Sequence, residues 1–96
     1  MLPVNSDIFE RDMGCTEAEW LGCLPGAVGK HTLVLDNHRA LVGDFLKITW
    51  KIEVPRTIAL ISISRLRVRF EFENCSEESR TKFMKYFDLY TQRGGG

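Results

Sequence analysis

One stretch of the sequence alternates apolar and polar residues without a break: Leu46-Lys47-Ile48-Thr49-Trp50-Lys51-Ile52-Glu53-Val54. Successive side chains of a β-strand point to opposite faces, so this alternation collects every apolar residue of the stretch on one face. The pattern predicts an antiparallel strand with one face in the core and the other in water. Pro55 lacks an amide donor, and we expect the strand to end at Pro55-Arg56.

The same alternation returns after a short interval, over Arg65-Leu66-Arg67-Val68-Arg69-Phe70-Glu71-Phe72-Glu73. Residues 57–63 lie between the two stretches and are rich in β-branched side chains, which favours a third strand. The apolar residues stand at odd positions up to Ile63 and at even positions from Leu66. This change of phase predicts a tight turn or a bulge near Ser64.

A hairpin is predicted upstream of these strands. Apolar residues 33–35 and 40–42 flank Asp36-Asn37-His38-Arg39, a sequence that is typical of a turn.

Two helices are predicted outside the strands. Thr16 and Glu19 have the spacing of a capping box, and we expect a helix of about two turns that stops at Pro25-Gly26. Ser76 is a favourable N-cap for a second, amphipathic helix of about 14 residues with Phe83 and Phe87 on its apolar face.

Together these elements predict an α+β fold. We expect a two-layer sandwich, with a mostly antiparallel sheet of four to five strands and a short N-terminal and a longer C-terminal helix on one face. The 96 residues suit one domain, placed at 1–93, in which 1–15 form an irregular N-terminal arm; residues 94–96 form a flexible glycine tail. The expected core comprises Trp20, Leu21, Leu24, Leu33, Leu35, Ile48, Trp50, Ile52, Ile61, Leu66, Val68, Phe70, Phe72, Phe83 and Phe87.

Composition argues against several classes of protein. The 13 basic and 13 acidic residues cancel, which argues against a non-specific nucleic-acid coat protein. Neither an apolar run of about 20 residues nor a signal peptide is present, so we expect a cytoplasmic protein without membrane contact. Three cysteines are an odd number and do not predict a disulfide framework.

Basic side chains on the polar face of the strands are the strongest candidate for a binding site. Three arginines follow one another at every second residue, about 7 Å apart along the strand. We predict a non-enzymatic binding or adaptor module that takes a polyanion, such as single-stranded nucleic acid, or an acidic protein surface. Since the aromatic residues alternate onto the other face, base stacking is disfavoured. The alternative is that Glu53, Glu71 and Glu73 neutralise the cations across the strands. The predicted site residues are Lys47, Lys51, Arg65, Arg67 and Arg69.

Enzymatic and cofactor-dependent functions find little support. The sequence carries no catalytic motif, so we expect neither an enzyme nor a cofactor. The cysteine and histidine spacings lack the short pairs of a structural zinc site. Residues 24–31 depart from the phosphate-binding loop at their first and last positions, and are interpreted as a glycine-rich connector.

The chain resembles short bacterial proteins of unknown function, on the segment from Cys15 to Leu21, the strand from Arg65 to Phe72 and the final helix. This resemblance implies no activity. Separately, the Arg93-Gly94-Gly95-Gly96 end is similar to that of ubiquitin-like and sulfur-carrier proteins, which are adenylated at Gly-Gly.

Three alternatives to the binding module therefore stay open. The first is a homodimer whose sheets pair through an open edge. The second is a glycine-tailed carrier, and the third is an enzyme that uses a thiol.

Overall fold

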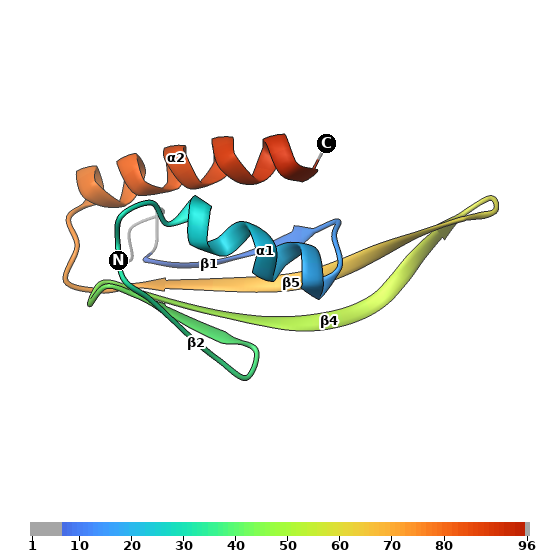
Figure 1. The fold of residues 1–96 in the computed structure, drawn as a ribbon, viewed down its shortest axis with the longest axis horizontal. Helices are drawn as coiled ribbons and strands as arrows, with labels where there is room; N and C mark the ends of the chain where they lie inside the picture. The colour runs from blue at the N-terminus through green and yellow to red at the C-terminus, as the bar shows by residue number, and fades with distance from the viewer. Residues whose placement is uncertain (1–6, 96) are drawn as a thin grey trace, which may run out of the picture.

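The computed structural model describes residues 7–95 and confirms the α+β class. Five antiparallel strands form one sheet in the order β1-β5-β4-β3-β2, and two helices cover one of its faces (Figure 1). We call the uncovered face the outer face. In chain order the elements are β1 (Ile8–Met13), α1 (Glu17–Ala27), β2 (Leu33–Asp36), β3 (Arg39–Val42), β4 (Leu46–Ile58), β5 (Ile61–Phe72) and α2 (Glu77–Gly95).

The N-terminal arm is not irregular over its whole described length. Residues 8–13 form β1, which pairs with β5 from Ile8 opposite Glu71 to Met13 opposite Leu66. Phe9 stacks on Phe70 with their ring centroids 5.0 Å apart. The expectation was wrong because charged Arg11 occupies a position on the covered face and hides the strand pattern. Residues 1–6 lie outside the described residues.

The first helix begins as predicted but ends later. Thr16 and Glu19 form both hydrogen bonds of the capping box. The helix does not stop at Pro25, which lies within α1. Burial of Leu24 and Ala27 in the core outweighs the single backbone hydrogen bond that a proline removes near a helix end.

The second helix also extends beyond its predicted end. Gly94 and Gly95 continue α2, so the described part of the expected flexible tail is helical, and Gly96 lies outside the described residues. Glycine weakens a helix by about 1 kcal/mol without terminating it. Among the described residues, neither helix is long and apolar enough to cross a membrane.

The three strands predicted between residues 46 and 73 are two longer strands in the structure. β4 does not end at Pro55 but continues to Ile58, and the chain turns at Ala59 and Leu60 into β5. The bulge predicted near Ser64 lies in β4 instead: the register shifts between Glu53 and Arg56, so that Val54 and Pro55 together lie opposite Ser64. Proline is tolerated at such a bulge since no regular ladder needs its amide.

Beyond this bulge the two strands leave the body of the protein. β3 pairs with β4 only as far as Thr49, and β1 pairs with β5 only as far as Leu66. Residues 54–64, which we call the projecting hairpin, therefore extend as a two-stranded ribbon past the helices (Figure 1).

The core lies between the helices and the covered part of the sheet. Trp20 of α1 packs edge-on against Trp50 of β4, and Phe87 of α2 packs against Phe70. Leu21 and Leu33 are half-buried at the margin of this core, while the other expected core residues except three are buried. The residues wrongly placed in the core are exposed, since no helix covers them: Leu35, Ile52 and Ile61. The buried apolar residues that were not predicted are Ala27, Val28, Ala40, Val42, Leu46 and Met84.

Candidate functional site

The five basic residues of the predicted site lie together on the outer face. Lys47 stands opposite Glu71, and Lys51 stands opposite Arg67 in the β4–β5 register. Arg65 and Arg69 stand opposite Glu53 and Thr49. The strands therefore gather the predicted cations on one surface, next to several carboxylates.

Most of these cations are paired, because β1 brings further acids to the same face. Arg67 is ion-paired to Glu10, Asp12 and Glu53, and Arg69 to Glu10 and Glu71. Exposed pairs of this kind contribute at most about 1 kcal/mol each, yet they cancel the local charge. The remaining pairs join Arg65 to Asp12 and Lys47 to Glu71.

Lys51 alone of the five has no ion pair in the described part of the chain. Glu73, expected among the neutralising acids, makes none with these cations in the described residues. Acids from β1 take its place, and they could not be foreseen while residues 8–13 were expected to be irregular. The outer face of the body is therefore a mixed-charge surface rather than a basic patch.

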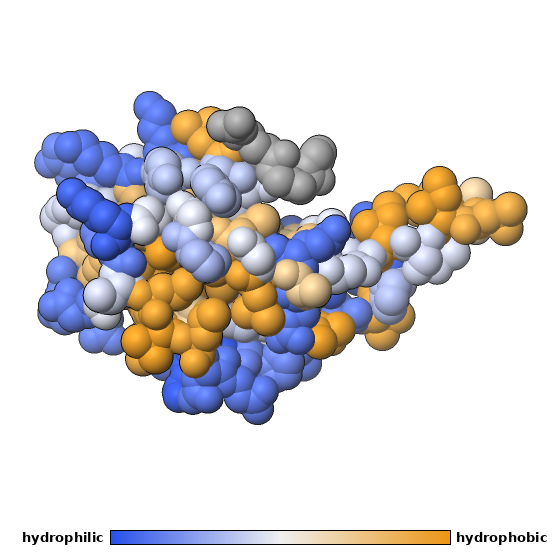
Figure 2. Space-filling view, in the orientation of Figure 1, coloured by the Kyte–Doolittle hydropathy of each residue, from blue (hydrophilic) through white to orange (hydrophobic). Residues whose placement is uncertain are grey.

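The projecting hairpin has a different surface. Thr57 to Ser64 contain no charged residue, and Arg56 and Arg65 flank them. Leu60 at the turn is fully exposed, and Val54 is 78% exposed. Figure 2 shows the apolar side chains of this tip standing clear of the body. The exposed aliphatic residues here are Val54, Ile58, Leu60, Ile61 and Ile63.

Pairing in the hairpin places its apolar residues beside its cations. Ile58 faces Ile61, and Arg56 faces Ile63, in the register that follows the bulge. Residues directly opposite one another point to the same side of the ribbon. Ile58, Ile61 and Ile63 thus continue the outer face outward from Arg65. Sequence periodicity indicated strands here but carried no sign that helices would leave them uncovered.

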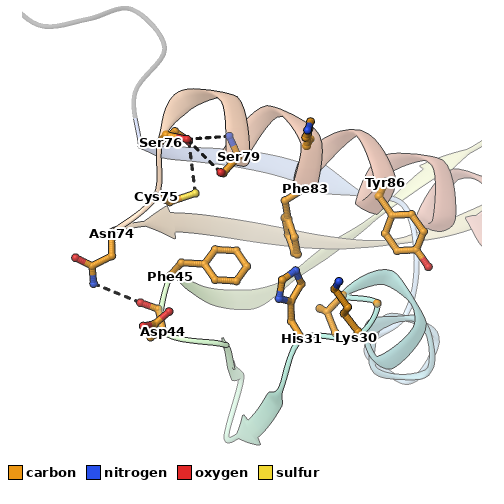
Figure 3. Close-up of a pocket in the computed structure, with 13 residues that line it drawn as sticks. Lys30, His31, Asp44, Phe45, Asn74, Cys75, Ser76, Ser79, Phe83 and Tyr86 are labelled. Carbon is orange, nitrogen blue, oxygen red and sulfur yellow. Dashed lines mark hydrogen bonds between the residues drawn. The ribbon is translucent and has the colours of Figure 1, made fainter.

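A hollow of about 680 Å³ opens at the other end of the molecule, where α2 meets three connecting segments (Figure 3). Its aromatic residues are His31, Phe45, Phe83 and Tyr86, and its polar residues are Lys30, Asp44, Asn74, Cys75, Ser76, Ser79 and Lys82; Val28 and Gly29 complete it. Residues 24–27 of the predicted glycine-rich connector belong to α1, and residues 28–31 form one wall of the hollow.

Two of the three cysteines, Cys15 and Cys75, are poorly suited to nucleophilic chemistry. All three are free and half-buried. Burial raises the pKa of the Cys15 thiol, with nearby Glu19 adding to the effect. Burial also raises the pKa of the Cys75 thiol. A raised pKa keeps the thiol protonated and unreactive at neutral pH. Among the described residues, no cluster of His, Cys, Asp and Glu is arranged to hold a metal ion.

Glu17 forms a polar junction that the sequence did not indicate. Its carboxylate accepts a hydrogen bond of 2.7 Å from Trp50 Nε1 and lies 2.6 Å from His38 Nδ1. The bond from Trp50 lowers the pKa of Glu17, and the hydrogen bond and charge of His38 act in the same direction. This junction joins α1 to β4 and to the β2–β3 turn, so its role is structural.

Comparison with known proteins assigns no family. No protein-family model matches the chain, and no curated protein matches it. The resemblance to short bacterial proteins stays a prediction, and function has to be argued from the surfaces described above.

Proposed function

We propose that this protein is a small, non-enzymatic binding module that docks reversibly on an anionic lipid surface, tip first, through the projecting hairpin. One observation carries the proposal. An uncharged aliphatic tip is exposed, with Leu60 fully so, and the charged residues that flank it, Arg56 and Arg65, are both cations. Exposed apolar patches on a soluble domain mark interaction sites.

The spacing of apolar and basic residues suits the lipid interface. At about 3.4 Å per residue, Arg56 lies roughly 7 Å behind Ile58, and Arg65 roughly 13 Å behind Ile61. Interfacial segments bury their apolar side about 5–10 Å into the boundary between headgroups and acyl chains. Arg56 would then sit among the lipid phosphates, and Arg65 just above them.

The expected attachment is weak and reversible. Burying one aliphatic side chain contributes about 1.5–3 kcal/mol when burial is complete, and here it is partial. Each basic residue near an anionic leaflet adds about 1 kcal/mol. Lys51, the unpaired cation of the predicted site, lies on the outer face behind the hairpin and adds to this attraction.

This proposal refines the polyanion predicted from the sequence. Residues 54–65 include no aromatic side chain on which a nucleic-acid base would stack. Energetically dominant residues of protein interfaces are enriched in Trp, Tyr and Arg, whereas this tip is aliphatic. The expectation of no membrane contact rested on the lack of a spanning segment, which interfacial docking does not require.

Pairing of two copies through the free edge of β4 is less favoured. Pro55 and the bulge lie on the free edge of β4, and both features obstruct the addition of another strand.

Vesicle co-sedimentation tests the proposal. We expect the protein to pellet with phosphatidylcholine vesicles containing phosphatidylserine, less at high salt, and little with phosphatidylcholine alone. Leu60→Asp should lower binding at least about tenfold, because it places a charge at the inserted tip. Val34→Asp is the matched control: Val34 is 58% exposed on β2, far from the tip, and undergoes the same change of charge.

Two results would overturn the proposal. One is equal binding by wild type and Leu60→Asp. The other is no binding to anionic vesicles at low salt; if light scattering then shows a dimer that Leu60→Asp dissociates, the hairpin joins two copies instead.

A further inference from the structure

We infer that the hollow beside α2 is a second binding site, which takes a small molecule with a flat aromatic ring and an anionic group. The inference does not depend on the projecting hairpin, which lies at the opposite end of the sheet (Figure 1).

The wall of the hollow is aromatic. The His31 ring lies 5.0 Å from the Phe45 ring and 5.8 Å from the Phe83 ring. Phe45 and Phe83 meet edge to face at 5.3 Å. Figure 3 shows these three rings converging in the middle of the hollow. Tilted and perpendicular rings of this kind present both edges and faces to a flat guest ring, the geometry in which aromatic pairs attract.

Two cations at the hollow set the charge of the ligand. Lys30 and Lys82 both line it, and neither forms an ion pair within residues 7–95. On the outer face, by contrast, four of the five basic residues have carboxylate partners. Asp44 lies at the other end of the hollow, beside Asn74, away from Lys30 (Figure 3). An anionic group is therefore favoured near the lysines, with the ring against the aromatic wall.

The serines add a donor to this site. The Ser76 hydroxyl accepts from the Ser79 amide and donates to the Ser79 hydroxyl oxygen. This arrangement leaves the hydroxyl proton of Ser79 free to point at a ligand in the hollow.

Contacts within the chain preform the hollow, so that no ligand is needed to hold its walls in place. The Tyr86 hydroxyl donates to the Gly26 carbonyl, which ties α2 to the end of α1. Gly29 has a φ of +67°, and a Cβ there would lie 3.4 Å from the Tyr86 ring. Glycine adopts this left-handed backbone conformation without strain, which lets the connector turn beside the tyrosine. A volume of about 680 Å³ falls within the range of small-molecule sites, about 300–1,000 Å³.

Fluorescence of 1-anilinonaphthalene-8-sulfonate, an aromatic anion, provides the test. We expect saturable binding of one probe per chain, weakened about three- to tenfold by Lys30→Gln and by Lys82→Gln through loss of a charge-assisted contact. Lys85→Gln is the matched control, because Lys85 is an exposed lysine of α2 outside the hollow. Benzoate and phenyl phosphate, used as competitors, distinguish a carboxylate ligand from a phosphate ligand.

Amide chemical shifts locate the bound probe. The inference predicts shifts at Gly29 to His31 and at Asn74 to Ser79. Probe affinity that neither lysine variant lowers would overturn it, as would shifts confined to the hairpin together with loss of binding in Leu60→Asp. The vesicle experiment varies only the hairpin, so failure of either proposal leaves the other standing.

Discussion

The two ends of the β4–β5 pair have the same sequence pattern and opposite environments. Ile48 at the covered end is 0% exposed, whereas Ile52, four residues further on the same face, is 58% exposed. The alternation is unbroken between them, and both residues are in strand. What differs is the second layer, because α1 and α2 pack over one end and not the other. An alternating pattern predicts a strand; a covering helix decides burial.

Charge differs between the two ends for a similar reason. At the covered end, β1 lies beside β5 and contributes Glu10 and Asp12 to the arginines. From Arg65 towards the turn, β4 is the only strand beside β5 within the described residues, and residues 54–64 contain no carboxylate. A third strand therefore supplies further hydrogen bonds and countercharge together, and the projecting hairpin has no third strand.

The largest expected effect on stability is at the covered end of the β4–β5 pair. Trp50→Ala is expected to cost about 3–5 kcal/mol of unfolding free energy, since it empties a buried space against Trp20. Ile52→Ala, on the same strand face, should cost less than about 1 kcal/mol. Urea unfolding of both variants measures this, and equal losses would contradict the comparison.

An intermediate effect is expected at the start of the helix that covers the body. Thr16→Ala removes the hydroxyl that accepts from the Glu19 amide and should cost about 1 kcal/mol. Thr57→Ala, in the uncovered hairpin, is the matched control and should leave the urea midpoint almost unchanged. A larger loss at Thr57 than at Thr16 would show that the hairpin, not α1, sustains the body.

Acidity should weaken the junction that fastens α1 to the body. The pKa of Glu17 is lowered in the folded protein, chiefly by the hydrogen bond from Trp50. The stabilisation is therefore fully present above the unfolded pKa of about 4.3 and is lost as pH falls through the lower folded pKa.

Glu17→Gln tests this assignment. The urea midpoint of wild type should exceed that of the variant at neutral pH, and the two should converge on acidification below about pH 4. A gap that stays constant from neutral to acidic pH would contradict a role for the carboxylate charge.

The smallest effect on stability is expected at the tip. Leu60→Asp should change the unfolding free energy by no more than about 0.5 kcal/mol, because the Leu60 side chain is fully exposed. Thermal unfolding of the variant beside wild type measures this. A loss near that of Trp50→Ala would mean that the tip is packed in solution and is not free to dock.

Local signals in the sequence account for most of the fold. The capping box at Thr16, the hairpin around Asn37 and the alternation after Leu46 each depend on neighbours a few residues away, and the structure confirms each of them. The strand Ile8–Met13 was not predicted, because charged Arg11 lies on the covered face, where the alternation of a strand calls for an apolar residue. Its charge is satisfied by Asp88, 77 residues away on α2.

The candidate sites were only partly predictable. The alternation placed five basic residues on one face, but their carboxylate partners on β1 come from a segment more than 50 residues earlier. The hollow joins Lys30 to Lys82 through the packing of α2, and no spacing in the sequence links them. Both cases depend on contacts between distant segments, which periodicity does not report.

By itself, the sequence determined most of the strands and helices and the apolar side of most of them, because backbone geometry imposes those periods locally. Only the tertiary structure decided how far the helices reach along the sheet. The reach of the helices separates a buried Ile48 from an exposed Ile52, and the reach of β1 separates a neutralised Arg67 from Arg56, which has no ion pair within the described residues. Burial and countercharge both require a second surface, and the position of that surface is set by the packing of the whole chain.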